Sequence, residues 1–357
     1  MSCPEFGLAP VRQADTLSGL IHLLLPRRFI SQGLDWNGIS GFLVNSHHPT
    51  LGRAAGKRYS WSLGVLGPEG NVVVARDLRR LTGNMVRVVD DAKTRAAAVY
   101  NAAAQYFDHP ALGFWDRFGQ ATVDRLDLHP GEQVLDVCSG SGASAIPAAR
   151  RVGPTGRVVA VDVAENLLAL AAAKAGRYGL DNLEFRHQDF ETLDCPPASF
   201  DAVVIVFGIF FLPDMTAAAA RLWEWVKPGG QLAVTTWGPE FLEPASSIFW
   251  SAVGELRPEL ERRYNPWDQL TEPEAVRSLL AHAGALTQQV EPVAATHRLT
   301  APADVWAMVL GTGLRGTYDA MTAHQQQLVE KRVLDEISAG HVSELQTNVI
   351  YAVATKV

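Results

Sequence analysis

The chain has 357 residues, of which 47% are hydrophobic and 19% charged, a composition typical of a globular protein with a sizeable core. Its net charge of −7 argues against a nucleic-acid partner, because such partners are usually bound by a basic surface. The scattered cysteines Cys3, Cys138 and Cys195 fit neither a disulfide framework nor a metal cluster, so we expect no metal site and a cytoplasmic location. No run of about 18 apolar residues predicts a membrane span.

Residues 1–84 differ from the rest of the chain in charge and pattern. They contain 9 basic and 5 acidic residues, whereas the remainder contains 22 basic and 33 acidic residues. Short strand-like pieces occur at Trp61–Leu66 and Asn71–Ala75, and Asp77–Leu81 predicts one helical turn. Met85 then opens a region typical of a domain start. Two interpretations stay open: Met85 is the true initiator, or residues 1–84 form a weakly structured accessory segment.

Residues 85–357 are expected to form one domain. Its predicted parts are a core at 120–237, a substrate-side insertion at about 238–285 and a C-terminal strand at about 346–357. Two helices precede the core and form an N-terminal helical lid, at Asp91–Phe107 and Trp115–Leu126, because alanine favours helix and apolar residues recur at helical spacing.

Apolar runs alternate with helical patterns through the core. The predicted strands are Val134–Val137, Arg157–Val161, Leu183–His187, Phe200–Val206 and Gln231–Thr236. The helices predicted between them are Ala143–Arg151, Glu165–Tyr178 and Thr216–Val226. Further helices are predicted at 272–283, 301–310 and 323–338, with a strand near 286–290. Strands that alternate with helices indicate an α/β fold with a doubly wound, mostly parallel sheet.

A glycine-rich turn, Ser139–Gly142, joins the first predicted strand to a helix of small residues. Glycine lets the backbone approach a ligand closely, and the start of a helix presents free N–H groups. These features predict a nucleotide-type cofactor site at the C-terminal edge of the sheet. The spacing Gly140-x-Gly142-x-x-Ala145 also fits a dinucleotide site, so a nicotinamide-dependent oxidoreductase is an alternative, although no Tyr-x-x-x-Lys pair is present.

Acidic residues stand at the ends of three successive predicted strands: Asp136, Asp162 and Asp189. With the turn Pro228-Gly229-Gly230 and the motif Asp136-Val137-Cys138-Ser139-Gly140-Ser141-Gly142, they resemble the class I S-adenosylmethionine-dependent methyltransferases. Within that superfamily the chain is similar to the ubiquinone/menaquinone-biosynthesis type and related small-molecule methyltransferases. The resemblance covers residues 92–237 and, more loosely, the C-terminal strand. Cys138 departs from it, since the family has glycine there.

The resemblance implies a seven-stranded Rossmann-like methyltransferase fold and S-adenosyl-L-methionine (SAM) as cofactor. Asp136 would accept a hydrogen bond from the methionyl ammonium, Asp162 from both ribose hydroxyls and Asp189 from the adenine amino group. The predicted cofactor-binding residues are Asp136, Ser139, Gly140, Gly142, Asp162, Val163, Asp189, Phe190 and Phe207.

Aromatic residues crowd the segments expected at the mouth of this site, which favours a small apolar or aromatic acceptor of the quinone-precursor or natural-product type, methylated at O or C. The predicted substrate-binding residues are Tyr106, Trp115, Phe210 and Trp237. His109 is the candidate base, with helix capping as its alternative role. A non-catalytic SAM-binding protein of the same fold also stays open, and we expect a monomer or homodimer. The sequence does not identify the acceptor.

Overall fold

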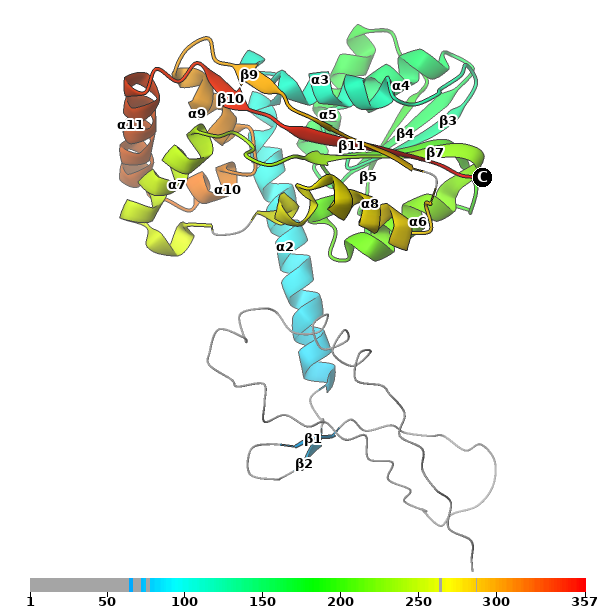
Figure 1. The fold of residues 1–357 in the computed structure, drawn as a ribbon, viewed down its shortest axis with the longest axis horizontal. Helices are drawn as coiled ribbons and strands as arrows, with labels where there is room; N and C mark the ends of the chain where they lie inside the picture. Colours follow the sequence, from blue (N-terminus) through cyan, green and yellow to red (C-terminus); the bar gives the residue numbers. More distant parts are fainter. Residues whose placement is uncertain (1–63, 67–71, 75–77, 263–264, 287) are drawn as a thin grey trace, which may run out of the picture. The chain divides into compact units, whose positions relative to one another are not determined.

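The computed structural model describes residues 64–66, 72–74, 78–262, 265–286 and 288–357 (Figure 1). The chain divides into two compact units after Val86. In the first, strands β1 (Gly64–Leu66) and β2 (Val72–Val74) pair antiparallel, within the two strand-like pieces predicted there. Most of residues 1–84 lies outside the described residues, so both interpretations of that segment stay predictions.

A seven-stranded sheet forms the centre of the second unit, with the strand order β5-β4-β3-β6-β7-β11-β8. Its strands are β3 (Gln133–Val137), β4 (Arg157–Asp162), β5 (Leu183–His187), β6 (Phe200–Val206), β7 (Val226–Trp237), β8 (Gln288–Val293) and β11 (Val349–Thr355). Strands β3 to β7 are parallel to one another, whereas β11 runs antiparallel to both β7 and β8. The predicted doubly wound, mostly parallel sheet is therefore confirmed.

Helices cover both faces of the sheet. Figure 1 shows α3 (Phe114–Val123) and α4 (Ala145–Val152) above it, and α6 (Met215–Trp225) and α8 (Pro273–His282) below. Successive residues of β3 enter different cores: Val134 packs with α4, and Leu135 packs with α6 and α8. Because both faces are covered, the central strands β4 and β6 contain continuous apolar runs, Val158–Val161 and Ala202–Val206.

The helix before the core is longer than predicted. Helix α2 runs from Leu78 to Phe107, whereas a single helical turn at Asp77–Leu81 and a separate helix at Asp91–Phe107 were expected. Gly83 and Asn84 are poor helix formers, which explains the late predicted start, yet the helix continues through them. It ends before His109-Pro110, as expected from the restriction that proline places on the preceding residue. Helix α5 (Glu165–Arg177) follows β4.

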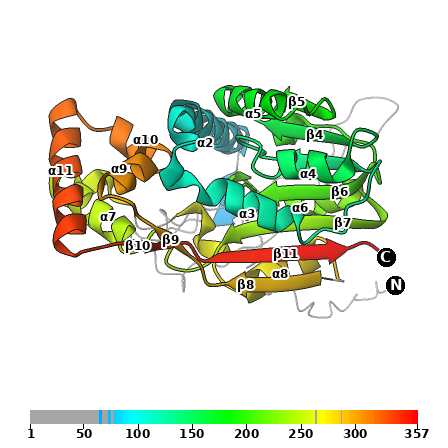
Figure 2. The same ribbon diagram turned by 90° about the horizontal axis from the view of Figure 1, so that it is seen from above.

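Two segments, rather than one, extend the basic sheet-and-helix pattern. The first contains α7 (Ala245–Leu256) and lies within the predicted insertion 238–285. The second, between β8 and β11, contains β9 (Thr296–Arg298), α9 (Ala303–Leu310), α10 (Arg315–Asp319), α11 (Ala323–Ala339) and β10 (Glu344–Gln346). Helix α11 packs against α7 and α9. Figures 1 and 2 both show α7, α9, α10 and α11 grouped beyond one end of the sheet. No described helix is long and apolar enough to cross a membrane.

Candidate active site

The glycine turn after β3 is tied to the end of the neighbouring strand β4. Cys138, Gly140 and Gly142 all have positive φ angles, of 56°, 52° and 82°. The amide of Gly140 donates a hydrogen bond to Asp162 Oδ2 at 2.8 Å, and the amide of Ala164 donates to Asp162 Oδ1 at 2.8 Å. This arrangement fixes the carboxylate of Asp162 beside the turn.

The two glycines of the turn have different surroundings. A Cβ on Gly140 would meet only Leu167, at 3.9 Å, so this position leaves the turn open. A Cβ on Gly142 would lie 3.1 Å from the Cβ of Ala171 and 3.2 Å from Ile146. Gly142 therefore allows α5 to pack closely against the turn, whereas Gly140 faces the cavity described next.

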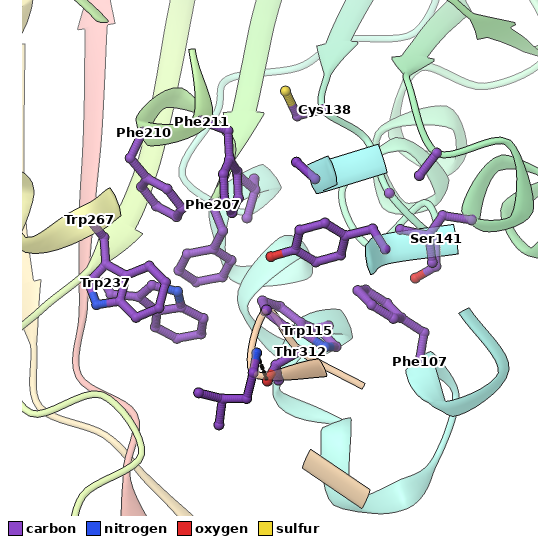
Figure 3. Close-up of a pocket in the computed structure, with 18 of the residues that line it drawn as sticks. Phe107, Trp115, Cys138, Ser141, Phe207, Phe210, Phe211, Trp237, Trp267 and Thr312 are labelled. Carbon is purple, nitrogen blue, oxygen red and sulfur yellow. Dashed lines mark hydrogen bonds between the residues drawn. The ribbon is translucent and has the colours of Figure 1, made fainter. Parts of the chain in front are cut away.

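A cavity of about 150 Å³ lies between the turn, α2, the end of β7 and the two additional segments. Figure 3 shows Ser141 and Phe107 on one side of it and Phe210, Trp237 and Trp267 on the opposite side. Ligand pockets usually measure about 300–1,000 Å³. The aromatic side chains must therefore move apart before a cofactor and an acceptor can both enter.

Aromatic rings stack along the wall of the cavity. Trp237, at the end of β7, lies between Phe207 and Phe241, with ring centroids 3.7 Å apart on both sides. Trp115 of α3 stacks on Phe107 of α2, with centroids 5.5 Å apart and planes 4° apart. This wall presents flat apolar surface and little polar surface, which suits a planar aromatic ligand.

Asp136 stands immediately behind the cavity lining. Its Oδ2 accepts a hydrogen bond from the hydroxyl of the lining residue Ser144 at 2.7 Å, while its Oδ1 is buried without a partner among the described residues. Burial raises the pKa of Asp136 to about 7, although the Ser144 hydrogen bond lowers it. Burial also raises the pKa of Asp162, whereas the two backbone amides lower it. The buried Ser139 hydroxyl and Trp115 indole N–H likewise have no described partner.

Comparison with known proteins relates this site to a family. Residues 134–230 match the methyltransferase domain family. Aklanonic acid methyltransferase DauC of Streptomyces sp. (strain C5) is 32% identical over 199 residues, which are 52% of this chain and 90% of that protein. The chain belongs to the class I S-adenosylmethionine-dependent methyltransferases.

Other relatives of this methyltransferase match over a smaller share of their length. Nocamycin O-methyltransferase of Saccharothrix syringae is 36% identical over 44% of this chain and 55% of that protein. Ubiquinone/menaquinone biosynthesis C-methyltransferase UbiE of Enterobacter sp. (strain 638) is 30% identical over 43% of this chain and 60% of that protein. A putative methyltransferase structure from an antibiotic biosynthesis pathway of Anabaena variabilis has a TM-score of 0.48 and 16% identity, covering 67% of this chain and 96% of that one.

Most of the predicted site residues of the methyltransferase come together in the cavity. The cofactor-binding candidates that line it are Ser139, Gly140, Asp162, Val163 and Phe207. The substrate-binding candidates that line it are Trp115, Phe210 and Trp237. The remaining candidates, which do not line it, are Tyr106, His109, Asp136, Gly142, Asp189 and Phe190.

Asp189 and Phe190 have structural partners away from the cavity lining. Asp189 Oδ2 accepts a hydrogen bond from Lys93 Nζ at 3.0 Å. Its Oδ1 accepts a hydrogen bond from the amide of Glu191, so Asp189 caps the short helix after β5. Phe190 is buried in the core, edge-on to Trp225 at 5.7 Å. The predicted adenine contacts of both residues stay predictions without geometric support.

His109 is an exposed capping residue. Its Nδ1 accepts from the amide of Ala111 at 3.2 Å, at the start of the short helix Pro110–Leu112. Tyr106 is half-buried and packs against the core instead of lining the cavity. The geometry therefore favours the capping role that was the alternative for His109, and its catalytic role stays a prediction.

The rest of the lining includes aromatic residues that the sequence pointed to and other residues that it did not. The aromatic-rich insertion contributes Phe241, Trp250 and Trp267, in the region where aromatic residues were expected. Arg262 and the stretch 312–314 also line the cavity, and neither was singled out from the sequence. Arg262 stands in a charged stretch of the insertion, next to Glu261 and Arg263, which gave no signal for it; residues 312–314 follow α9 and carry no recognisable motif.

Proposed function

We propose that this methyltransferase transfers the methyl group of SAM to an oxygen or carbon atom of a small aromatic acceptor. The observation that carries the proposal is the Asp162 carboxylate, held by two backbone amides at the glycine turn and opening into an aromatic cavity. When bound, SAM supplies an electrophilic methyl group on a sulfonium. The residues of this chain contribute binding, alignment and exclusion of water.

The polar groups at the turn fit the charged end of SAM. The buried Oδ1 of Asp136 and the hydroxyl of Ser139 have no described partner, and buried polar atoms normally have one. A methionyl ammonium would satisfy Asp136, directly or through a water molecule, and a neighbouring donor would satisfy Ser139. Each oxygen of Asp162 accepts one amide and keeps a lone pair for a ribose hydroxyl.

The aromatic wall supports alignment as the main catalytic contribution. In-line displacement on a sulfonium needs the nucleophile held in place and water kept out. Trp237, packed between two phenylalanine rings and 2% exposed, anchors this wall and helps to keep water out. No histidine belongs to the cavity lining among the described residues. The proposal therefore relies on an acceptor that ionises readily rather than on an imidazole base.

The acceptor class is supported by the names of relatives, and the predicted partners and location are supported by composition alone. A small-molecule acceptor accords with relatives named for nocamycin, aklanonic acid and the ubiquinone/menaquinone pathway. The absence of a nucleic-acid partner, a cytoplasmic location and a monomeric or homodimeric state stay predictions. Family membership removes the support for the nicotinamide alternative. An activity assay distinguishes a catalytic methyltransferase from a non-catalytic SAM-binding protein.

Calorimetric titration with SAM tests the cofactor site. We expect a micromolar dissociation constant and, for Asp162→Ala, a loss of about tenfold or more because a charge-assisted hydrogen bond is removed. Asp194→Ala, which changes an exposed acid outside the cavity lining, is the matched control and should bind normally. Absence of SAM binding by the wild-type protein would refute the proposal. SAM binding without methylation of any member of an aromatic acceptor panel, followed by mass spectrometry, would favour the non-catalytic role.

A further inference from the structure

The described lining of the cavity contains one acidic and one basic side chain, which belong to different segments of the chain. Among the described lining residues, Asp162 is the only carboxylate and Arg262 the only basic side chain. Asp162 belongs to the cofactor end, where Gly140 and Ala164 hold it. Burial raises the pKa of Tyr100, whose hydroxyl also stands in the field of both charges, because Asp162 raises this pKa further and Arg262 lowers it. Arg262 therefore supplies positive charge to the same cavity beyond the glycine turn.

Arg262 has no hydrogen-bond or ion-pair partner among the described residues, unlike arginines such as Arg125 and Arg315, which hold carboxylates. Arg262 is an exposed residue that also lines the cavity, and its partial burial there lowers the pKa of the guanidinium. The only other group that acts on this pKa is Tyr100. An arginine stays charged under these conditions, so the cavity lining contains a cation whose N–H groups are open to solvent and to a ligand and are not taken up by a described side chain.

An outer groove adjoins the cavity and shares Tyr100, Phe210, Phe211 and Arg262 with it. Besides Arg262, the groove is lined by Lys93 and Arg95, and its one acidic lining residue, Asp319, is engaged by Arg315 at 2.8 Å. Lys93 is itself paired with Asp189 and Glu191. Arg95 and Arg262 are therefore the basic side chains of the groove lining without a described carboxylate partner, although the chain as a whole carries −7. Basic side chains in a groove attract anions locally.

We propose that Arg262 binds a carboxylate of the acceptor, and that this methyltransferase therefore selects aromatic carboxylic acids over neutral aromatic compounds. This inference rests on the proposed function. The planar guanidinium matches a carboxylate through two parallel hydrogen bonds, and the aromatic wall beside it accommodates the rings. Arg262 is assigned as a specificity residue, while the methyl-accepting atom lies elsewhere on the acceptor.

A single guanidinium favours a carboxylate over a phosphate ester. A carboxylate carries one negative charge, which one arginine neutralises, whereas a phosphate monoester carries about 1.5 to 2 at neutral pH. No second unpaired cation lies in the described lining of the cavity to balance the excess. Burying that excess charge among aromatic rings would be unfavourable.

Matched acceptor probes test the inference by calorimetry in the presence of S-adenosyl-L-homocysteine. The probes are 1-hydroxy-2-naphthoate with its neutral amide, salicylate with salicylamide, and 1-naphthyl phosphate. We expect the wild-type protein to bind at least one carboxylate about tenfold or more tightly than its amide. Arg262→Gln should lose this preference and bind the amide within about threefold of wild type, and Arg262→Lys should keep part of it. Arg277→Gln, on α8 and outside the cavity lining, should behave as wild type.

SAM affinity, measured for every variant, separates this inference from the proposed function. Arg262→Gln should bind SAM as the wild type does, since Arg262 lies apart from the glycine turn. Three results would overturn the inference while leaving the cofactor site intact: no carboxylate binds, carboxylates bind no better than amides, or the preference survives in Arg262→Gln. Tighter binding of 1-naphthyl phosphate than of any carboxylate would also overturn it. Failure of SAM to bind at all would instead refute the proposed function.

Discussion

Lowering the pH from 7 to 6 is expected to weaken SAM binding about fivefold, because an ammonium group binds the ionised form of Asp136 and not its neutral form. The pKa of this residue in the free protein is about 7, raised mainly by burial. An ammonium placed beside the unpaired Oδ1 would favour the charged form and lower the pKa in the complex. SAM therefore binds with loss of a proton below pH 7.

The magnitude follows from the fraction of Asp136 that is ionised. With a pKa of about 7, this fraction is about one half at pH 7 and about one eleventh at pH 6. The ratio gives the fivefold loss, and each further unit below pH 6 costs about tenfold more. The α-amino group of SAM changes little over this range, since such groups titrate near pH 8. The raised pKa of Asp162 acts in the same direction.

Titration calorimetry in two buffers of different ionisation enthalpy measures both the affinity and the proton release. Asp136→Asn is the informative variant, because asparagine still accepts the Ser144 hydrogen bond but cannot ionise. We expect it to bind SAM about tenfold more weakly at pH 7.5 and with a smaller dependence on pH. If the wild-type affinity were the same at pH 7 and pH 6 and no proton were released, the assignment of Asp136 to the ammonium would be wrong.

Three further variants test parts of the site that pack or cap. The side chain of Lys174 is 8% exposed, and its Nζ lies 3.0 Å from Oδ1 of Asp108, which follows α2. Lys174→Met should therefore lower the free energy of unfolding, measured by urea titration, by about 1–3 kcal/mol. The cost stays moderate because the Asp108 side chain is 38% exposed. No change in the urea midpoint would contradict this. Trp237→Ala should cost about 3–5 kcal/mol, because it empties the space between two stacked rings. A cost below 1 kcal/mol would mean that the stack is not formed in solution. His109→Ala should keep methyl transfer within about twofold of wild type and cost about 0.5–2 kcal/mol of stability through the lost cap. A hundredfold loss of turnover would restore its catalytic role.

The strands and the glycine turn could be predicted because their signals are local. Strands β5 and β6 begin and end at the predicted residues, since apolar runs bounded by turns depend on near neighbours alone. Strand β7 was predicted from Gln231, but it begins at Val226, which pairs with Phe200 of β6. That pairing is a tertiary contact which the turn residues Pro228-Gly229-Gly230 conceal. Strand β9 was missed for the same reason, because its three residues are extended only by pairing with β10.

The cofactor half of the site and the acceptor half differ in how far apart their residues lie in the chain. Ser139 and Gly140 follow one strand and Asp162 ends the next, so parallel pairing alone brings them to one edge of the sheet. Asp189 shows the limit of this reasoning: its strand also ends at that edge, yet Lys93 and the helix that follows take up its carboxylate.

The acceptor half is built by segments that no local pattern links. Tyr100 comes from α2, Arg262 from the first additional segment and Thr312 from the second, and the packing of α11 against α7 and α9 joins the two segments. Helix packing depends on complementary surfaces that are distant in sequence, so periodicity predicts each helix but not its neighbour. Arg262 acquires its meaning only in that packing, because an arginine beside two other charged residues, Glu261 and Arg263, is typical of a solvated surface. Its position in an aromatic cavity, without a described carboxylate partner, is what turns it into a recognition group for an acid.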